Sequence, residues 1–125
     1  MAIISVNHFK QKIGQHGVAW GDVAMRTILQ VTETILGDSA LYGRVDDGRI
    51  LIYFLNVPDD ELDKKMKNIL SRLEHSDYKI GDHNIRCTVA LATVQGVADY
   101  TTMYHEVEEA LHIAKITKGK QYVRI

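Results

Sequence analysis

The chain has 125 residues, of which 46% are hydrophobic and 25% are charged, and its formal net charge is −1. This composition is typical of one globular domain with a substantial core. The near-neutral charge gives no broad attraction to nucleic acid or to an anionic membrane, so neither is an expected partner. The single cysteine, Cys87, excludes an internal disulfide and fits a reducing compartment. No apolar run approaches the roughly 20 residues of a membrane span, and no signal peptide is visible. We therefore expect a cytoplasmic domain.

The first third of the chain alternates strand and helix patterns. Residues 2–6 are apolar and β-branched and predict a buried strand. Residues 8–20 mix apolar, basic and glycine residues, which indicates a loop or a short irregular helix. Gly21-Asp22 is expected to open the first long helix, with Asp22 placed to interact with the exposed N–H groups of its first turn. Gly37 is a natural end for that helix.

The middle of the chain predicts a central β-hairpin at Leu41-Leu55. Two strand-like runs, residues 40–45 and 49–55, flank Asp47-Gly48. An Asp-Gly pair in such a place favours a type I′ turn, because that turn needs positive φ at both central residues. The second run is nearly all apolar, so we expect both of its faces to be covered. The local pattern indicates a turn, and whether the turn also presents its tip to a ligand stays open.

The last part of the chain predicts two more helices, a second hairpin and a closing strand. Pro58-Asp59-Asp60 is expected to start a helix. Its buried stripe would consist of Leu62, Met66, Ile69, Leu70 and Leu73. Residues 78–80 and 85–94 indicate a hairpin around Gly81-Asp82. A third helix is expected over about residues 101–117, ending at Gly119, with Met103, Val107, Ala110, Leu111 and Ala114 buried. Tyr122-Val123 would close the order β α β β α β β α β, which implies a mixed sheet with helices packed on it, an α+β fold.

Residue chemistry by itself indicates no catalytic site. The six histidines form no helical His-x3-His pair, and His105 with His112 supplies only two ligands where a zinc site needs three or four. No Gly-x4-Gly-Lys-Ser/Thr phosphate loop is present. Lys115, Lys118 and Lys120 cluster at an expected helix C-terminus. There they would complement the helix dipole or contact a phosphate.

Four stretches, taken together, resemble the GGDEF domain, the diguanylate cyclase fold. Residues 5–22 are similar to the family's D-x-D-x-F-K-x-I-N-D-x-x-G-H-x-x-G-D, with matches at Phe9, Lys10, Gly17, Gly21 and Asp22. The signature R-x-G-G-D-E-F corresponds to Arg44-Val45-Asp46-Asp47-Gly48-Arg49-Ile50. Residues 87–92 are similar to V-T-x-S-I-G-x-A, and residues 107–120 to the ending A-D-x-A-L-Y-x-A-K-x-x-G-R. The resemblance covers nearly the whole chain and implies a nucleotide-cyclase, ferredoxin-like mixed sheet.

The resemblance implies a two-metal site whose carboxylates this chain lacks. In the family, two Mg²⁺ ions are held by the first Asp of D-x-D and the acidic third residue of the signature, with the signature Glu close by. Those positions are Ser5, Gly48 and Arg49 here. Magnesium needs hard anionic oxygens, which a hydroxyl, a missing side chain and a cation do not supply. Two-metal phosphoryl transfer is therefore expected to be absent, and no Mg²⁺ or other cofactor is expected.

The nucleotide contacts that the resemblance implies are mostly missing as well. Ile13 replaces an asparagine, so Asp22 alone remains of the base-reading pair. Asp46 and Asp47 replace the signature glycines and would oppose a triphosphate. Lys115 aligns with a phosphate-contacting lysine, and the product-inhibition motif R-x-x-D is absent at residues 37–40. A shift of register could make Asp46 and Asp47 metal ligands, but Ser5 would still leave the opposite ligand missing.

We therefore predict a single, catalytically inactive, degenerate GGDEF domain over residues 1–125, taken from a longer bacterial signalling protein. Its expected role is regulatory, through neighbouring domains of the same polypeptide, a homodimer, or control of an adjacent EAL phosphodiesterase domain. The parent protein could be membrane-anchored even though this domain is not expected to contact the membrane. Alternatives are a GTP-sensing module without turnover, supported by Asp22 and Lys115, an unrelated α+β interaction domain, and an active cyclase with a displaced site.

Overall fold

The computed structural model describes residues 1–46, 48–76, 78–80, 83–85, 88–94, 99–116 and 122–124. Its elements follow in the order β1 (Ala2–Val6), α1 (Phe9–His16), α2 (Val18–Leu36), a 3-10 turn η1 (Gly37–Ser39), β2 (Ala40–Asp46), β3 (Arg49–Phe54), α3 (Asp59–Glu74), β4 (Lys79–Ile80), β5 (His83–Asn84), β6 (Val89–Thr93), α4 (Tyr100–Ile116) and β7 (Tyr122–Arg124). No helix in these described ranges is long and apolar enough to cross a membrane.

Five strands form one mixed sheet in the order β2-β3-β1-β6-β7. All neighbouring pairs are antiparallel except β6 and β7, which run parallel. The central strand β1 pairs with β3 on one side and β6 on the other, so that Ile4 lies between Ile50 and Leu91. The expected mixed sheet with helices packed on it is confirmed.

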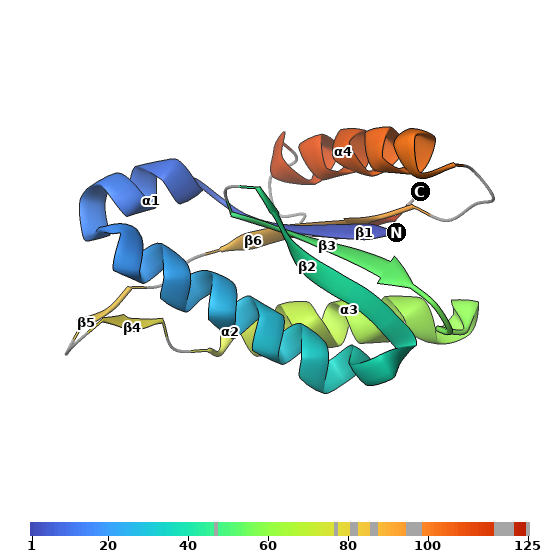
Figure 1. Ribbon diagram of the computed structural model, residues 1–125, viewed down its shortest axis with the longest axis horizontal. Helices are drawn as coiled ribbons and strands as arrows, with labels where there is room; N and C mark the ends of the chain where they lie inside the picture. Colours follow the sequence, from blue (N-terminus) through green and yellow to red (C-terminus); the bar gives the residue numbers. More distant parts are fainter. Residues whose placement is uncertain are drawn as a thin grey trace.

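Helices cover both faces of the sheet, with α2 and α3 on one side and α4 on the other (Figure 1). Side chains alternate along a strand, so Ile4 of β1 joins the core under α2 and α3, while Ile3 joins the core under α4. The predicted helix stripes are confirmed: Leu62, Met66, Ile69 and Leu73 are buried, Leu70 packs beside them, and all five predicted α4 positions are buried. The helix α4 lies mainly over β6, β7 and β1.

The first long helix begins earlier than predicted. Residues 9–16 form the regular helix α1, and α2 starts at Val18 rather than at Gly21. The reason is tertiary: Trp20 is fully buried, and its indole N–H donates to the Ile85 carbonyl at 3.1 Å. Asp22 consequently lies beyond the first turn of α2, so its expected contact with the first-turn N–H groups was wrong. Gly37 ends the helix as predicted, with φ of +53°.

The central hairpin of β2 and β3 is confirmed, but the coverage expected for its second strand was wrong in part. Ile50 and Ile52 are buried on the α2 side, whereas Tyr53 on the other side is 43% exposed. That exposure arises because α4 lies toward the opposite edge of the sheet. Gly48 has φ of +79°, as a turn of this kind requires, and Asp47 is outside the described residues.

The second hairpin differs from its prediction. Two-residue strands β4 and β5 form a separate small sheet, and β6 pairs with β1 in the main sheet. All five residues of β6 are buried and four of them are apolar, which favours a place inside the large sheet over a surface hairpin. Gly81, Asp82, Cys87, Lys118, Gly119 and Lys120 lie outside the described residues.

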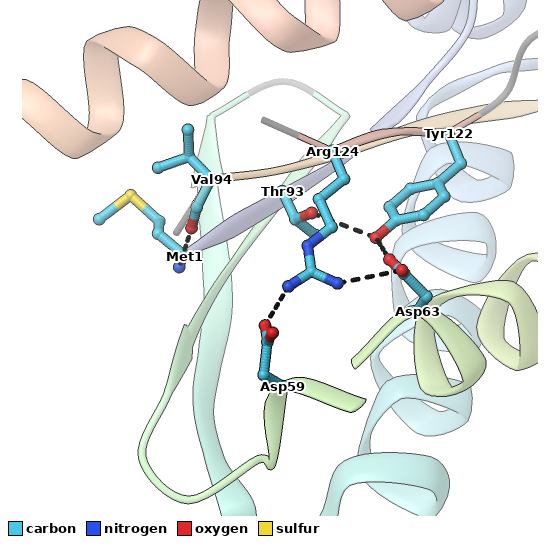
Figure 2. A network of polar contacts seen from close by, with 7 residues as sticks. All are labelled: Met1, Asp59, Asp63, Thr93, Val94, Tyr122 and Arg124. Carbon is cyan, nitrogen blue, oxygen red and sulfur yellow. Dashed lines mark hydrogen bonds and ion pairs between the residues drawn. The ribbon is translucent and has the colours of Figure 1, made fainter. Parts of the chain in front are cut away.

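A polar network fastens the last strand to α3 (Figure 2). The Arg124 guanidinium contacts the carboxylates of Asp59 and Asp63, the latter at 3.0 Å. The Tyr122 hydroxyl donates to Asp63 at 2.5 Å and lies 3.2 Å from the Thr93 hydroxyl. Partial burial and the Asp63 hydrogen bond raise the pKa of Tyr122 to about 12. The network joins three elements at a sheet edge strand, where backbone pairing alone leaves one side free.

Candidate functional site

The end of β1 and the turn of the central hairpin meet at one point of the sheet. Ser5 and Arg49 are register partners in the β1–β3 ladder, and the Val6 N–H donates to the Gly48 carbonyl at 2.8 Å. Ser5 is only 2% exposed. The two positions that correspond to the family's metal ligands, Ser5 and Gly48, and the signature position beside them, Arg49, are thus neighbours in space.

An arginine ion pair occupies this point. Arg49 Nη1 lies 3.2 Å from Glu108 Oε2 on α4, and Arg49 Nε lies 3.8 Å from Asp46 Oδ1 at the end of β2. The Arg49 side chain is one quarter exposed, so water screens the pair only in part. Arg49 therefore links the hairpin to α4 across the face of the sheet.

The charges around Arg49 are coupled. Partial burial lowers the pKa of the Arg49 guanidinium, but its hydrogen bond to Glu108 and the carboxylates of Asp46 and Glu108 outweigh burial, so the pKa is raised. Partial burial and the positive charge of Arg49 lower the pKa of Lys115, which Asp46 partly opposes. Two cations and two carboxylates thus balance one another at this end of the sheet.

The hairpin turn leaves no room for a side chain at position 48. A Cβ built on Gly48 would lie 2.6 Å from Phe9 Cγ and 2.8 Å from Phe9 Cβ. Phe9 is buried and its ring lies beside Trp20 at a centroid distance of 6.2 Å. Gly48 is therefore required both by its positive φ and by the Phe9 ring that covers the turn.

The two remaining nucleotide-contact candidates lie on helices that cover opposite faces of the sheet (Figure 1). Asp22 is on α2, and its carboxylate pairs with Arg44 of β2 at 3.5 Å, with both side chains about half exposed. Lys115 is exposed in the last turn of α4. The structure therefore gives Asp22 an internal partner and leaves Lys115 beside Arg49.

Comparison with known proteins places this geometry in a family. The sequence profile of the family described as diguanylate cyclase, GGDEF domain, matches residues 1–121. The chain belongs to the GGDEF family. The expected resemblance is thereby confirmed, and no curated protein sequence matches the chain.

Solved GGDEF structures share the fold at low sequence identity. The diguanylate cyclase SiaD of Pseudomonas aeruginosa, solved in complex with its activator SiaC, is 18% identical with a TM-score of 0.88 over 99% of this chain and 48% of its own. The active GGEEF domain of a Vibrio cholerae diguanylate cyclase is 20% identical, with a TM-score of 0.76 over 98% and 78%. An EAL/GGDEF domain protein from M. capsulatus is 21% identical, with a TM-score of 0.85 over 98% and 81%. The chain spans about half the length of the SiaD chain.

In this GGDEF domain, the residues at the hairpin do not fit a divalent metal. Ser5 offers a hydroxyl, Gly48 offers no side chain, and Arg49 places a cation where Mg²⁺ would need carboxylate oxygens. Within the described ranges, no group of three or more His, Cys, Asp or Glu residues could hold a metal ion. Asp46, the one described acidic candidate of the signature, is paired with Arg49.

Sequence reasoning missed the two partners that complete the site. Glu108 and Arg44 stand in the stretches compared with the family, but neither was given a role. The helical spacing of Tyr104, Glu108 and Lys115, four and then seven residues apart, is a signal that they share a face of α4. The spacing does not say which residue packs against that face, because Arg49 is 59 residues away from Glu108.

Proposed function

We propose that this GGDEF domain has no cyclase activity and acts as a regulatory or interaction domain in cyclic di-GMP signalling. The observation that carries the proposal is the position of Arg49. It stands directly opposite Ser5 in the β1–β3 ladder and is bound to Glu108. By analogy with the family's signature, in which the position of Arg49 is a glutamate close to the metals, the guanidinium would take the place of positive metal ions.

Electrostatics supports the loss of activity. A fixed cation repels Mg²⁺, and the hydroxyl of Ser5 cannot replace the negative charge of a ligating carboxylate. The carboxylates of Asp46 and Glu108, which are close enough to attract a cation, are already paired with Arg49. Two-metal stabilisation of the attacking and leaving oxygens is the main contribution of such sites, so its loss removes catalysis rather than slowing it.

The ion pair between Arg49 and Glu108 could also hold this end of the sheet together in the way that a bound metal ion would. Arg49 on β3 is bonded to Glu108 on α4, and this bond joins two elements that are far apart in the sequence. A domain held in this way needs no divalent ion for its folding at the hairpin. We expect its thermal unfolding midpoint to be the same with Mg²⁺ and with EDTA, whereas a metal-binding domain would be stabilised by its ligand.

The regulatory part of the proposal concerns partners. The GGDEF relatives include a protein that also carries an EAL domain and a cyclase bound to an activator protein. By analogy, this domain contacts neighbouring domains of its own cytoplasmic polypeptide, as a monomer or homodimer, and controls their activity. The full-length gene product tests this step directly: a following EAL domain would make phosphodiesterase control measurable with and without residues 1–125.

The test of inactivity is a cyclic di-GMP synthesis assay. The purified chain is incubated with GTP and Mg²⁺ or Mn²⁺, with the active GGEEF domain of Vibrio cholerae as the positive control. We expect no product above the protein-free blank. Product formation that disappears in Asp46→Asn would refute the proposal and would place an active metal site at a displaced carboxylate.

A GTP-sensing module without turnover is the second candidate, and Lys115 favours it. No ion pair joins the Lys115 ammonium to any described carboxylate, so it is available to a phosphate. Calorimetry with GTP, with and without Mg²⁺, distinguishes the candidates when Lys115→Ala serves as the control. Heat that is lost in the variant supports sensing, and absence of heat at millimolar GTP argues against it.

A further inference from the structure

Part of the sheet face on the α4 side is apolar, and no helix among the described residues lies over it. Leu51 of β3 packs on the α4 side of the sheet, and its register partner across the hairpin is Gly43. Leu41 and Tyr53, the next pair on that face, are 61% and 43% exposed, and Val45 is 41% exposed. Cross-strand partners share a face, so these five residues form one surface, which we call the β2–β3 floor.

The floor is bordered by one side of α4. Tyr104 packs against the same core cluster as Leu51, and Tyr100 stacks on Tyr104 with ring centroids 5.9 Å apart. Glu108 follows one turn later and reaches the floor through Arg49. The floor and this wall of Tyr100, Tyr104 and Glu108 together form a trough that runs along α4.

The trough has the width of a helix. Among the strands, α4 contacts β6 most extensively, followed by β7 and β1. Helices pack roughly 8–10 Å apart, and strands lie about 4.8 Å apart, so a second helix beside α4 would be centred two strands from β6. In the order β2-β3-β1-β6-β7 that strand is β3. The uncovered floor thus coincides with a vacant helix position.

The floor also offers a place for one large side chain. A hollow of about 230 Å³ is lined by Leu41, Gly43, Val45, Leu51 and Tyr53, among others. On the same measure a single water needs only about 10–15 Å³, so this open hollow is large enough for an aliphatic or aromatic side chain. A Cβ on Gly43 would meet nothing within 4 Å, which shows that glycine leaves this space open.

Charge and edge geometry narrow the occupant. Arg49 is paired at the hairpin end of the trough, while Lys115 has no ion pair with a described residue, so a carboxylate there would be complementary. The outer face of α4 carries the exposed His105–Glu109 pair together with exposed Ile113 and Ile116, so α4 of a second copy is the competing occupant, and self-association of the chain would reveal it. A bulge between Arg44 and Asp46 distorts the outer edge of β2, which disfavours strand addition.

We propose that this trough binds an amphipathic α-helix supplied from outside this chain. The helix lies beside α4 with its apolar face on the β2–β3 floor, one large side chain in the hollow over Gly43, and a carboxylate near Lys115. This inference rests on the proposed regulatory function, because it names the surface through which the domain would contact a partner. Failure to bind a helix would leave the absence of cyclase activity untouched, and the two tests are separate.

The test uses a phage-displayed library of amphipathic helical peptides of about 18 residues, or five turns. The library is selected on the 125-residue chain. Enriched peptides are synthesised, and their binding is followed by calorimetry, circular dichroism and amide chemical shifts. The decisive variant is Gly43→Val, which fills the hollow while placing a β-branched residue in a strand with ordinary backbone angles. Val18→Ser is the matched control, because it removes an exposed apolar side chain from α2, the helix that covers the other face of the sheet.

We expect enriched peptides with apolar residues at helical spacing and an acidic residue, a gain of helicity on binding, and shifts at Leu41, Gly43 and Leu51. Gly43→Val should weaken binding roughly tenfold or more, because the peptide's large side chain can no longer enter the hollow. Val18→Ser should bind as the wild type does. Lys115→Glu should weaken the acidic peptides. Equal binding by Gly43→Val, shifts on another surface, selected sequences without helical spacing, or self-association that Gly43→Val abolishes would each overturn the proposal.

Discussion

Gly48→Ala tests the tightest contact at the hairpin. The backbone at Gly48 has φ of +79°, a region in which an L-residue costs about 1–2 kcal/mol. The new Cβ would also lie 2.6 Å from Phe9 Cγ, 2.8 Å from Phe9 Cβ and 3.0 Å from Phe9 Cδ2. Moving a buried aromatic ring to relieve such overlap costs about 1–3 kcal/mol. We therefore expect a loss of about 2–5 kcal/mol from the free energy of unfolding.

The assay is urea unfolding followed by the fluorescence of Trp20, the single tryptophan, which lies beside Phe9. Gly43→Ala is the matched control: it changes another hairpin glycine with open space around it, so its effect should stay within about 0.5 kcal/mol. A double-mutant cycle with Phe9→Ala separates the two contributions, because only the overlap depends on the ring. In the Phe9→Ala background, Gly48→Ala should cost only the backbone strain of about 1–2 kcal/mol. An unchanged cost in that background, or a wild-type stability for Gly48→Ala alone, would refute the reasoning.

Three further predictions concern the ion pair, the C-terminal network and the start of α4. Arg49→Gln should lower the free energy of unfolding by about 1 kcal/mol, and its urea double-mutant cycle with Glu108→Gln should show positive coupling, which would be zero if the pair were fully screened. Because the pKa of Tyr122 is raised to about 12 in the folded state, its contribution is present below pH 10 and lost between pH 10 and 12. In Tyr122→Phe the decrease in the free energy of unfolding between pH 10 and 12 should be smaller by about 1 kcal/mol, after allowance for solvent screening. Thermal unfolding midpoints that depend on pH in the same way in both proteins would contradict this. The Asp99 carboxylate accepts the Thr102 N–H at 2.9 Å, which lowers its pKa. Asp99→Ala should therefore speed amide exchange in the first turn of α4 at neutral pH, and the difference should fade only as the pH falls below the ordinary carboxyl value of about 3.9 and through the lowered pKa. Exchange that is equally fast in both proteins at neutral pH would count against that cap.

The sequence comparison singled out Ser5, Gly48 and Arg49 together, and in the structure these three residues are neighbours. That they stand where a relative would hold its metal ions stays a prediction. The sequence comparison did not anticipate that Arg49 would be held by Glu108 or that Asp22 would pair with Arg44. Both pairings join residues of different elements. Which side chains meet depends on where a helix lies over the sheet, and the spacing of residues within one element does not carry that information.

The sequence by itself determined the elements whose signals are local. The buried strand Ala2–Val6, the helix stripes around Met66 and Val107, the Asp-Gly turn and the helix end at Gly37 all follow from periodicity or from backbone requirements of neighbouring residues. Only the tertiary structure decided the early start of α2. There, a buried Trp20 bonds to a carbonyl 65 residues away, and that contact outweighs the local preference for a start at Gly21.

The tertiary structure also decided which apolar residues are covered. The sequence of strand β3 is apolar on both faces, yet α4 lies over β6, β7 and β1 and leaves Tyr53 exposed. Burial is a property of the neighbour as well as of the strand, so an apolar pattern states what a face can bury and not what covers it. The same reason explains why a hairpin readable from Asp47-Gly48 acquired its charge pairing, and its uncovered floor, only in the folded domain.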